Sequence, residues 1–402
     1  MTQELTDTDG AFPSSEVMGA KRDGIRARNE RLILSLIHRD GAMAKADIAR
    51  ATGLSAQTVS VIMRNLEADG LLRRGEPVRG RVGQPSVPMG LDPDGAFALG
   101  LKVGRRSLDM VLIDFAGTVR KRLRRTHRYP TPDETVAFAC DAVVALRDHL
   151  APGRHHRIAG LGIAIPFALW DWGTTIGASD REMEQWRDRD IARELSEQTE
   201  CAVWLQNDAS AACGAELTFG PRDRVGDFVY VYIAYFAGGG IVQGGRLYTG
   251  PRGNAGALGS IPIPDSSGTT RQLIDVASLS GLETRLTELG LSPEVLWGPP
   301  ESWEVDDCAL GAWVEEAARG LACAIVASTA VTDASLVLID GWLPVALRAR
   351  LVTATRAQLE RIPHIGIDLP TVEAGSIGPD ARALGAASLP LWERYFLDST
   401  AS

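Results

Sequence analysis

Residues 45–72 read KADIARATGLSAQTVSVIMRNLEADGLL, and this stretch predicts two short helices joined by a tight turn. Gly53 can take the positive φ that often ends a helix, and Ser55 is typical of the residue that caps the next one. Apolar residues after the cap recur at helical spacing and predict a face packed on a core: Val59, Ile62, Met63 and Leu66. Another helix is predicted upstream, from the apolar residues Ile33, Leu36 and Ile37.

The second helix of this stretch carries short or forked hydrogen-bonding side chains away from its apolar face, a set suited to base edges and phosphates in a major groove. Residues 71–91 then predict two strands around a basic loop, RGRVGQP at 79–85, suited to a minor groove or a phosphate backbone. A helical hairpin with a solvated polar face is the alternative, but the turn spacing, the third helix and the basic loop favour a winged helix-turn-helix. The residues predicted to contact a double-stranded DNA operator are Ser55, Gln57, Thr58, Ser60, Arg64, Arg79, Arg81 and Gln84.

Charge is divided unevenly along the chain. The 402 residues carry a net charge of −9, but residues 21–90 hold 13 Lys+Arg against 7 Asp+Glu and are therefore at +6, which leaves −15 elsewhere. A positive field confined to the predicted reading unit is the electrostatic footprint of a DNA-binding domain. The five cysteines are scattered without a CxxC pair, which favours a reducing, cytoplasmic setting, and we expect no signal peptide or membrane span. Residues 1–20 are polar and predict a disordered tail.

From residue 96 onward, strands alternate with helices after an opening meander, which predicts an α/β fold of two lobes. Strands are expected at 97–103, 107–114, 119–123, 158–165, 201–206, 227–234 and 335–340. Helices are expected at about 131–150, 191–199, 211–217, 271–289, 308–332, 343–362 and 380–394, with a glycine-rich segment at 237–259.

Four sequence blocks follow one another in this part of the chain: GLGIAIP at 160–166, QNDASAA at 206–212 with Glu216 and Gly220, GGRLYTG at 244–250 and AGALGS at 255–260. In this order they resemble the ROK family, which groups sugar kinases with repressors that carry an N-terminal winged helix-turn-helix. The resemblance implies an actin-like, sugar-kinase fold over residues 96–402, with lobes of about 96–206 plus 380–402 and of 207–379, behind a DNA-binding domain at 21–91. It also implies a sugar-responsive homodimer or homotetramer.

Departures from the family pattern bear on catalysis. The kinase phosphate turn, Asp-x-Gly-Gly-Thr, corresponds here to Lys102-Val103-Gly104-Arg105-Arg106, and the second phosphate loop, Gly-Thr-Gly-Ile-Gly, corresponds to residues 234–238, AYFAG. A phosphate turn needs close backbone approach, which long side chains obstruct. The family's zinc-binding His and cysteine cluster are replaced by Ser260 and residues 267–270, SGTT. We therefore expect no catalytic residues, no metal site and no cofactor.

The sugar cleft is partly retained by resemblance. Asn207 and Asp208 match the family's Asn-Asp pair, and Glu283 matches a sugar-contacting Glu, so these three are the candidate effector-binding residues. Ala257 and Ser260 stand where the family has Glu and His, and a helix cap is the alternative role for Asp208. The sequence favours a repressor of carbohydrate genes that responds to a sugar or sugar-derived effector. The alternatives are a sugar kinase with a fused DNA-binding domain and a ligand-independent regulator.

Overall fold

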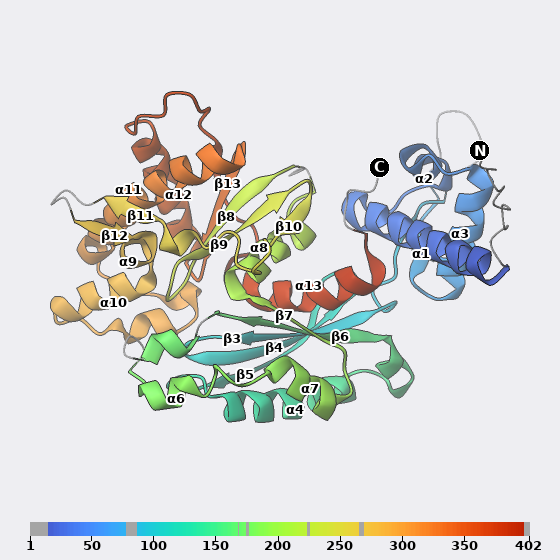
Figure 1. Ribbon diagram of the computed structural model, residues 1–402, viewed down its shortest axis with the longest axis horizontal. Helices are drawn as coiled ribbons and strands as arrows, with labels where there is room; N and C mark the ends of the chain where they lie inside the picture. The colour runs from blue at the N-terminus through green and yellow to red at the C-terminus, as the bar shows by residue number, and fades with distance from the viewer. Residues whose placement is uncertain are drawn as a thin grey trace, which may run out of the picture. The chain divides into compact units, whose positions relative to one another are not determined.

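The computed structural model describes residues 15–77, 87–167, 169–173, 177–222, 226–264 and 269–397. These residues form two compact units (Figure 1). The first comprises the chain up to Leu91 together with Tyr395–Leu397, and the second covers Asp92–Arg394. We describe each unit by itself.

The N-terminal unit is a winged helix-turn-helix. Helices α1 (Ser15–Asp40), α2 (Lys45–Thr52) and α3 (Ala56–Ala68) are followed by the antiparallel strands β1 (Leu72–Arg74) and β2 (Met89–Leu91). Gly53 ends α2 at φ 68°, and the Ser55 hydroxyl accepts the Thr58 N–H at 3.1 Å to cap α3. The predicted apolar face of α3 is confirmed, because Val59, Ile62, Met63 and Leu66 are all buried.

Two boundaries differ from the sequence-based expectation. Helix α1 begins at Ser15, so residues 15–20, predicted to be disordered, are helical; residues 1–14 lie outside the described residues. A polar composition does not separate a solvated helix from a disordered tail. Residues 395–397, predicted to belong to the first lobe, instead belong to the DNA-binding unit.

The segment 395–397 completes the core of the N-terminal unit. The Phe396 side chain is fully buried, and its ring stacks on His38 of α1 with centroids 4.6 Å apart. The Phe396 carbonyl accepts from Arg31 Nε at 2.7 Å, and the Leu397 N–H donates to the Ser35 hydroxyl at 2.8 Å. One face of α1 is thereby covered by a part of the chain about 360 residues away in sequence.

The second unit is built on two five-stranded sheets with the same topology. The first sheet has the order β5-β4-β3-β6-β7, in which β3, β4 and β5 are antiparallel and β6 and β7 are parallel to β3. Its strands are β3 (Phe97–Val103), β4 (Ser107–Asp114), β5 (Val119–Thr126), β6 (Ile158–Ile165) and β7 (Val203–Asn207). Helices α4 (Pro132–His149) and α7 (Ile191–Thr199) pack together, and α4 lies against this sheet (Figure 1).

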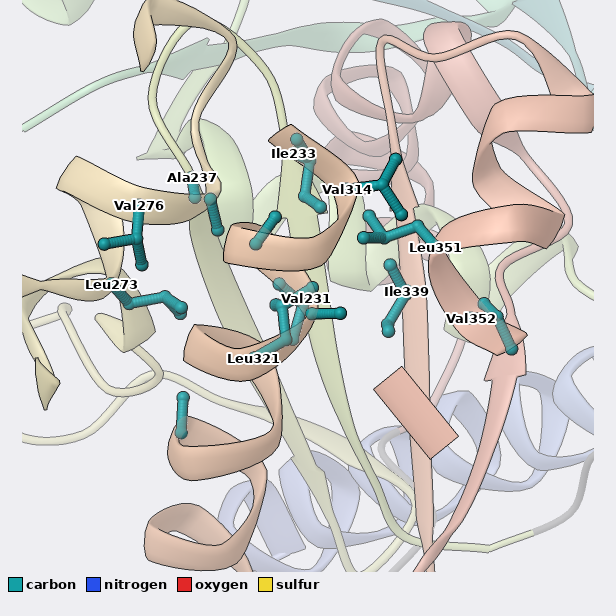
Figure 2. Packing of buried hydrophobic residues seen from close by; sticks show 14 of the residues in the cluster. Val231, Ile233, Ala237, Leu273, Val276, Val314, Leu321, Ile339, Leu351 and Val352 are labelled. Atoms are coloured by element: carbon teal, nitrogen blue, oxygen red, sulfur yellow. The ribbon is translucent and has the colours of Figure 1, made fainter. Parts of the chain in front are cut away.

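The second sheet has the order β10-β9-β8-β13-β14, again three antiparallel strands extended by two parallel ones. Its strands are β8 (Phe228–Ile233), β9 (Gly238–Gln243), β10 (Arg246–Tyr248), β13 (Leu336–Gly341) and β14 (Thr371–Ala374). Figure 2 shows its main core, in which Val231, Ile233 and Ile339 of the sheet meet Leu321 of α11 (Asp307–Thr332) and Leu351 of α12 (Val345–Leu359). The hairpin β9–β10 lies in the segment described only as glycine-rich from the sequence, and β14 was not predicted.

The helix predicted at 271–289 is in fact two helices. Helix α9 (Leu273–Ala277) and helix α10 (Leu279–Glu288) are separated by Ser278, whose backbone is extended. The Ser278 hydroxyl accepts the Ala237 N–H at 2.7 Å, and its carbonyl accepts Trp313 Nε1–H at 3.0 Å. These tertiary bonds hold the break and cannot be read from local periodicity.

Two helices lie between the sheets, each packed on the sheet that it does not follow (Figure 1). Helix α8 (Asp208–Phe219) follows β7 of the first sheet but packs on β9 of the second. Helix α13 (Ala381–Tyr395) follows β14 but packs on the first sheet: a Cβ added to Gly162 of β6 would lie 1.8 Å from the Ala386 carbonyl. Where the helices cross, a Cβ on Gly385 would lie 1.7 Å from the Ala211 carbonyl, so glycine permits this contact.

The remaining elements are short. They are helix α6 (Asp180–Glu184), the hairpin of β11 (Pro262–Pro264) and β12 (Thr270–Gln272), and the 3₁₀ turns η1 (Pro152–Arg157), η2 (Leu169–Trp172), η3 (Leu258–Ser260), η4 (Pro293–Trp297), η5 (Pro300–Ser302) and η6 (Gly378–Asp380). Within the described residues, no helix combines the length and the apolar character that crossing a bilayer requires.

Candidate functional site

The predicted reading helix presents a polar face. Gln57 and Arg64 of α3 are exposed, and Thr58 and Ser60 are half-buried beside the apolar stripe. Ser55 is exposed but engaged at the helix start, where its hydroxyl also bonds the Thr58 hydroxyl at 2.8 Å. Arg64 and Gln57 are therefore the long side chains on α3 that are available to reach a DNA groove. Arg79, Arg81 and Gln84 lie outside the described residues.

The second unit contains a cavity of about 80 Å³, and the sequence did not predict the composition of its wall. Its wall combines cations with aromatic rings from both halves of the unit. The cations are Lys102, Arg105, Arg106, Arg124 and Arg382, the aromatic residues are Tyr235, Trp297 and Trp342, and Glu283 is the acidic lining residue. We call it the cationic cavity.

Lys102, the next-to-last residue of β3, lines the cationic cavity. Its ammonium group lies 2.8 Å from an Asp109 carboxylate oxygen and 2.9 Å from the Ser107 hydroxyl. Burial, with Arg382 and Arg124 nearby, lowers the pKa of Lys102 to about 8, although Asp109 opposes the shift. Asp109 also faces Arg124 at 3.5 Å, and the balance of its burial against these cations lowers its own pKa.

The turn between β3 and β4 supplies two arginines that stack on rings of the other lobe. The Arg105 guanidinium carbon lies 3.9 Å from the centroid of Tyr235, which belongs to the turn between β8 and β9. The Arg106 guanidinium carbon lies 3.9 Å from the Trp297 ring. The β3–β4 turn and the β8–β9 turn therefore contact one another at the cationic cavity.

Asp208 and Asn207 are not part of the wall of this cavity. The Asn207 side-chain oxygen accepts the N–H groups of Ala209 and Ser210, so Asn207, not Asp208, caps α8. Asp208 accepts from Arg382 of α13 at 3.1 Å, with both side chains largely buried. Asp208 therefore acts on the cavity through Arg382.

Glu283 of α10 is the one predicted effector-binding residue that lines the cationic cavity among the residues described. Its carboxylate accepts the Trp297 Nε1–H and so orients the ring on which Arg106 stacks. Ala257 and Ser260 are exposed and are not part of the wall. The absence of the family's Glu and His at these two positions therefore does not bear on this cavity. Its polarity comes from Arg105, Arg106 and the other cations.

Sequence reasoning missed the cationic cavity because its charges come from β3, β5, one turn and α13. Lys102, Arg105 and Arg106 were noticed only as replacements that remove phosphate binding. Arg124 and Arg382 gave no signal in a single sequence. Among the described residues, His, Cys, Asp and Glu side chains form no group of three that could hold a metal ion.

Comparisons with known proteins agree with this architecture. The ROK family model matches residues 98–392, and a winged helix-turn-helix DNA-binding model matches residues 26–73. The chain is 25% identical over 381 residues to the uncharacterized protein y4fQ of Sinorhizobium fredii, covering 93% of each chain. It is 24% identical over 239 residues to the xylose repressor of Bacillus subtilis, covering 60% of this chain and 61% of that protein.

Solved structures show the same fold. The chain resembles a ROK family transcriptional regulator, described as a homolog of the E. coli MLC protein, at a TM-score of 0.67 and 20% identity, covering 92% of this chain and 97% of that one. It also resembles a ROK family glucokinase from Streptomyces griseus at a TM-score of 0.57 and 21% identity, covering 73% of this chain and 99% of that one. The chain therefore belongs to the ROK family, with a winged helix-turn-helix DNA-binding unit ahead of its sugar-kinase-like unit.

Proposed function

We propose that this ROK protein is a cytoplasmic, sequence-specific DNA-binding repressor of carbohydrate genes, released or retained by a sugar-derived effector. The observation that carries the DNA-binding part is α3, whose exposed polar side chains stand opposite a fully buried apolar stripe. Similarity to proteins named xylose repressor and transcriptional regulator supports it. Binding as a homodimer or homotetramer is part of the proposal, because two-fold symmetric operators suit such assemblies.

An operator selected from random duplexes with the purified chain tests this proposal. Arg64→Ala should weaken operator binding by about 1–3 kcal/mol if Arg64 reads a base, or flatten the salt slope by about one if it contacts a phosphate. Arg193→Ala is the matched control, because Arg193 is an exposed arginine of α7 paired only with Glu197 in the described residues. Equal operator affinity of the Arg64 variant and the control would exclude α3 as the reading helix.

The absence of kinase activity is the second part of the proposal. A kinase uses an acid and small residues at the first phosphate turn, whereas here Lys102 pairs with Asp109 and Arg105 covers Tyr235. Two guanidinium groups thus occupy the region in which phosphates would need close backbone approach. Sugar-dependent ATP turnover above background in a coupled assay would favour the alternative, a kinase with a fused DNA-binding unit.

Effector response is the third part of the proposal. Operator affinity measured across a panel of sugars and sugar derivatives should change with at least one of them. The size of the change is set by the difference between the ligand's affinities for two states of the protein. A flat response across the whole panel would support the other alternative, a ligand-independent regulator.

A further inference from the structure

The cationic cavity contains hydrogen-bond donors that nothing in the described residues satisfies. Nε and Nη1 of Arg105, Nε of Arg106 and Nε of Arg382 are buried and lack a hydrogen-bond partner. Buried polar groups in folded proteins are nearly always paired, and an unpaired buried donor costs free energy comparable to a lost hydrogen bond. Three arginines with unsatisfied nitrogens around one cavity therefore call for an acceptor that the described residues do not provide.

Aromatic stacking does not remove this need. The rings of Tyr235 and Trp297 cover the flat faces of Arg105 and Arg106. A guanidinium group donates its hydrogen bonds from its edge, in the plane of the group, and not from its face. Stacking thus fixes the orientation of both groups, while Nε and Nη1 of Arg105 and Nε of Arg106 stay available for an acceptor such as an oxyanion.

The charges around the cavity are also unbalanced. Five cations line it, against Glu283 in the wall and two carboxylates outside the wall, Asp109 and Asp208. Asp109 is shared by Lys102 and Arg124, and Asp208 binds Arg382. Glu283 is the carboxylate whose charge acts on Arg106, and it is the one acidic residue that lines the cavity among the described residues, so the positive surplus lies at the β3–β4 turn.

The shape of the site limits the size of the acceptor. The cationic cavity, at about 80 Å³, has room for a compact charged group. A wider hollow of about 850 Å³ shares Tyr235 and Glu283 with it and carries charges of both signs, among them Arg271 and Glu316. A ligand can therefore place an anionic end among the arginines while its hydroxylated body extends past Tyr235 and Glu283.

We propose that the cationic cavity binds the oxyanion of a small sugar-derived ligand, a phosphate ester or a sugar acid, through the edges of Arg105 and Arg106. Trp297 and Tyr235 hold the two guanidinium groups in place, and Arg382 adds a third donor from α13. This inference rests on the proposed function, because it names the chemical class of the effector. It also gives the β3–β4 turn, whose residues differ from those of the kinase phosphate turn, a role in binding an anion.

Isothermal titration of the full chain with matched ligands tests the proposal. Glucose, glucuronic acid, glucose 6-phosphate and inorganic phosphate separate a neutral sugar, a carboxylate, a phosphate ester and the bare anion. We expect binding of at least one of the three anions, weakened by added salt, and little binding of glucose. The arm that binds most tightly identifies the carboxylate or the phosphate as the source of the charge.

Variants assign the binding to the arginines. Arg106→Gln should weaken binding of the preferred anion about 10- to 100-fold, because a hydrogen bond to a charged group is lost. Arg106→Lys keeps the charge but not the forked geometry and should fall between Arg106→Gln and wild type. Arg125→Gln is the control: Arg125 is the next residue after Arg124 on β5, stacks on Phe138 at 5.0 Å and points away from the cavity toward Asp141.

The proposal is overturned if glucose binds as tightly as its anionic derivatives, if none of the three anions binds at millimolar concentration, or if Arg106→Gln and Arg125→Gln bind alike. Operator binding by the same preparations separates this result from a failure of the proposed function. A chain that binds its operator and responds only to neutral sugars keeps the repressor assignment and loses the anion site. A chain that binds these anions through Arg106 but binds no DNA keeps the anion site and loses the repressor assignment.

Discussion

The two sheets of the ROK unit share one topology but differ in the turn that each contributes to the centre. In the first sheet, the turn of the β3–β4 hairpin is Gly104-Arg105-Arg106. In the second sheet, the turn of the β8–β9 hairpin is residues 234–237, AYFA. These equivalent turns meet, with Arg105 stacked on Tyr235. The helices that follow the last strands, α8 and α13, also meet, through the Asp208–Arg382 pair.

The difference shows that one sheet topology can carry turns of different chemistry. One turn supplies cations and the other supplies an aromatic ring, and the two stack on one another. A stacked arginine on an exposed ring is worth about 0.5–1 kcal/mol, and more when it is desolvated. The contact between the two turns therefore helps to hold the halves of the unit together.

The largest effect is expected where the two central helices cross. Gly385→Ala places a Cβ 1.7 Å from the Ala211 carbonyl of α8, so α13 must shift, and the unit should lose about 3 kcal/mol or more of stability. Gly214→Ala in α8 is the control, because its Cβ would meet only a Leu247 methyl at an ordinary 3.6 Å. That substitution should be neutral or stabilising by up to about 1 kcal/mol. Equal melting temperatures for the two variants would contradict the close crossing.

The next effect concerns the pair that joins the two helix starts. Asp208→Asn leaves Arg382 largely buried without its carboxylate and should cost about 2–3 kcal/mol, below the usual cost of breaking a fully buried pair because both side chains retain some exposure. Arg382→Met in the same chain should recover most of that loss. Chemical unfolding of both single variants and the double variant measures the coupling; strictly additive losses would show that the pair is not coupled.

Lys102 provides a pH test of the first turn. Its pKa is lowered to about 8 in the folded chain by burial, with Arg382 and Arg124 adding to the shift and Asp109 and Ser107 packed against it. The unfolded lysine keeps a pKa of about 10.4, so above pH 8 the unfolded state binds more protons and stability rises with pH. Relative to Lys102→Met, the wild type should gain about 1 kcal/mol between about pH 7 and 9. A pH-independent difference between the two chains would mean that Lys102 titrates normally.

The smallest effect is the contact between the turns. A double-mutant cycle with Arg105→Gln and Tyr235→Leu should give a coupling of about 0.5–1 kcal/mol. Urea denaturation gives each free energy of unfolding that the cycle needs. A coupling of zero would mean that the two turns lie together without stabilising one another.

Local signals explain what the sequence could predict. Gly53 and Ser55 act through their own backbone and neighbours, so the helix ends around them followed from residue type alone. The winged helix-turn-helix was predicted from such local signals and the ROK fold from the resemblance of four sequence blocks, and both are confirmed. The break at Ser278 was missed because it is held by Ala237 and Trp313, which are distant in sequence.

The candidate site was harder to predict for the same reason. Glu283 was found through the family resemblance and lines the cavity, and its contact with an effector stays a prediction. Asn207 was predicted from the family's Asn-Asp pair, but its side-chain oxygen caps α8. Arg382 lies 174 residues from Asp208, and without the fold nothing relates the two. A charge cluster assembled by topology leaves no spacing pattern to recognise.

The packing of Phe396 on α1 has a consequence for the order in which the two units can fold during synthesis. Arg31 is synthesised 365 residues before the carbonyl that it binds, so a nascent chain carries the reading helix long before its DNA-binding unit has a complete core. The ring that fills this core emerges only after the whole ROK unit. Synthesis thus completes the ROK unit before the DNA-binding unit, and an interrupted chain leaves α1 without the ring that covers His38.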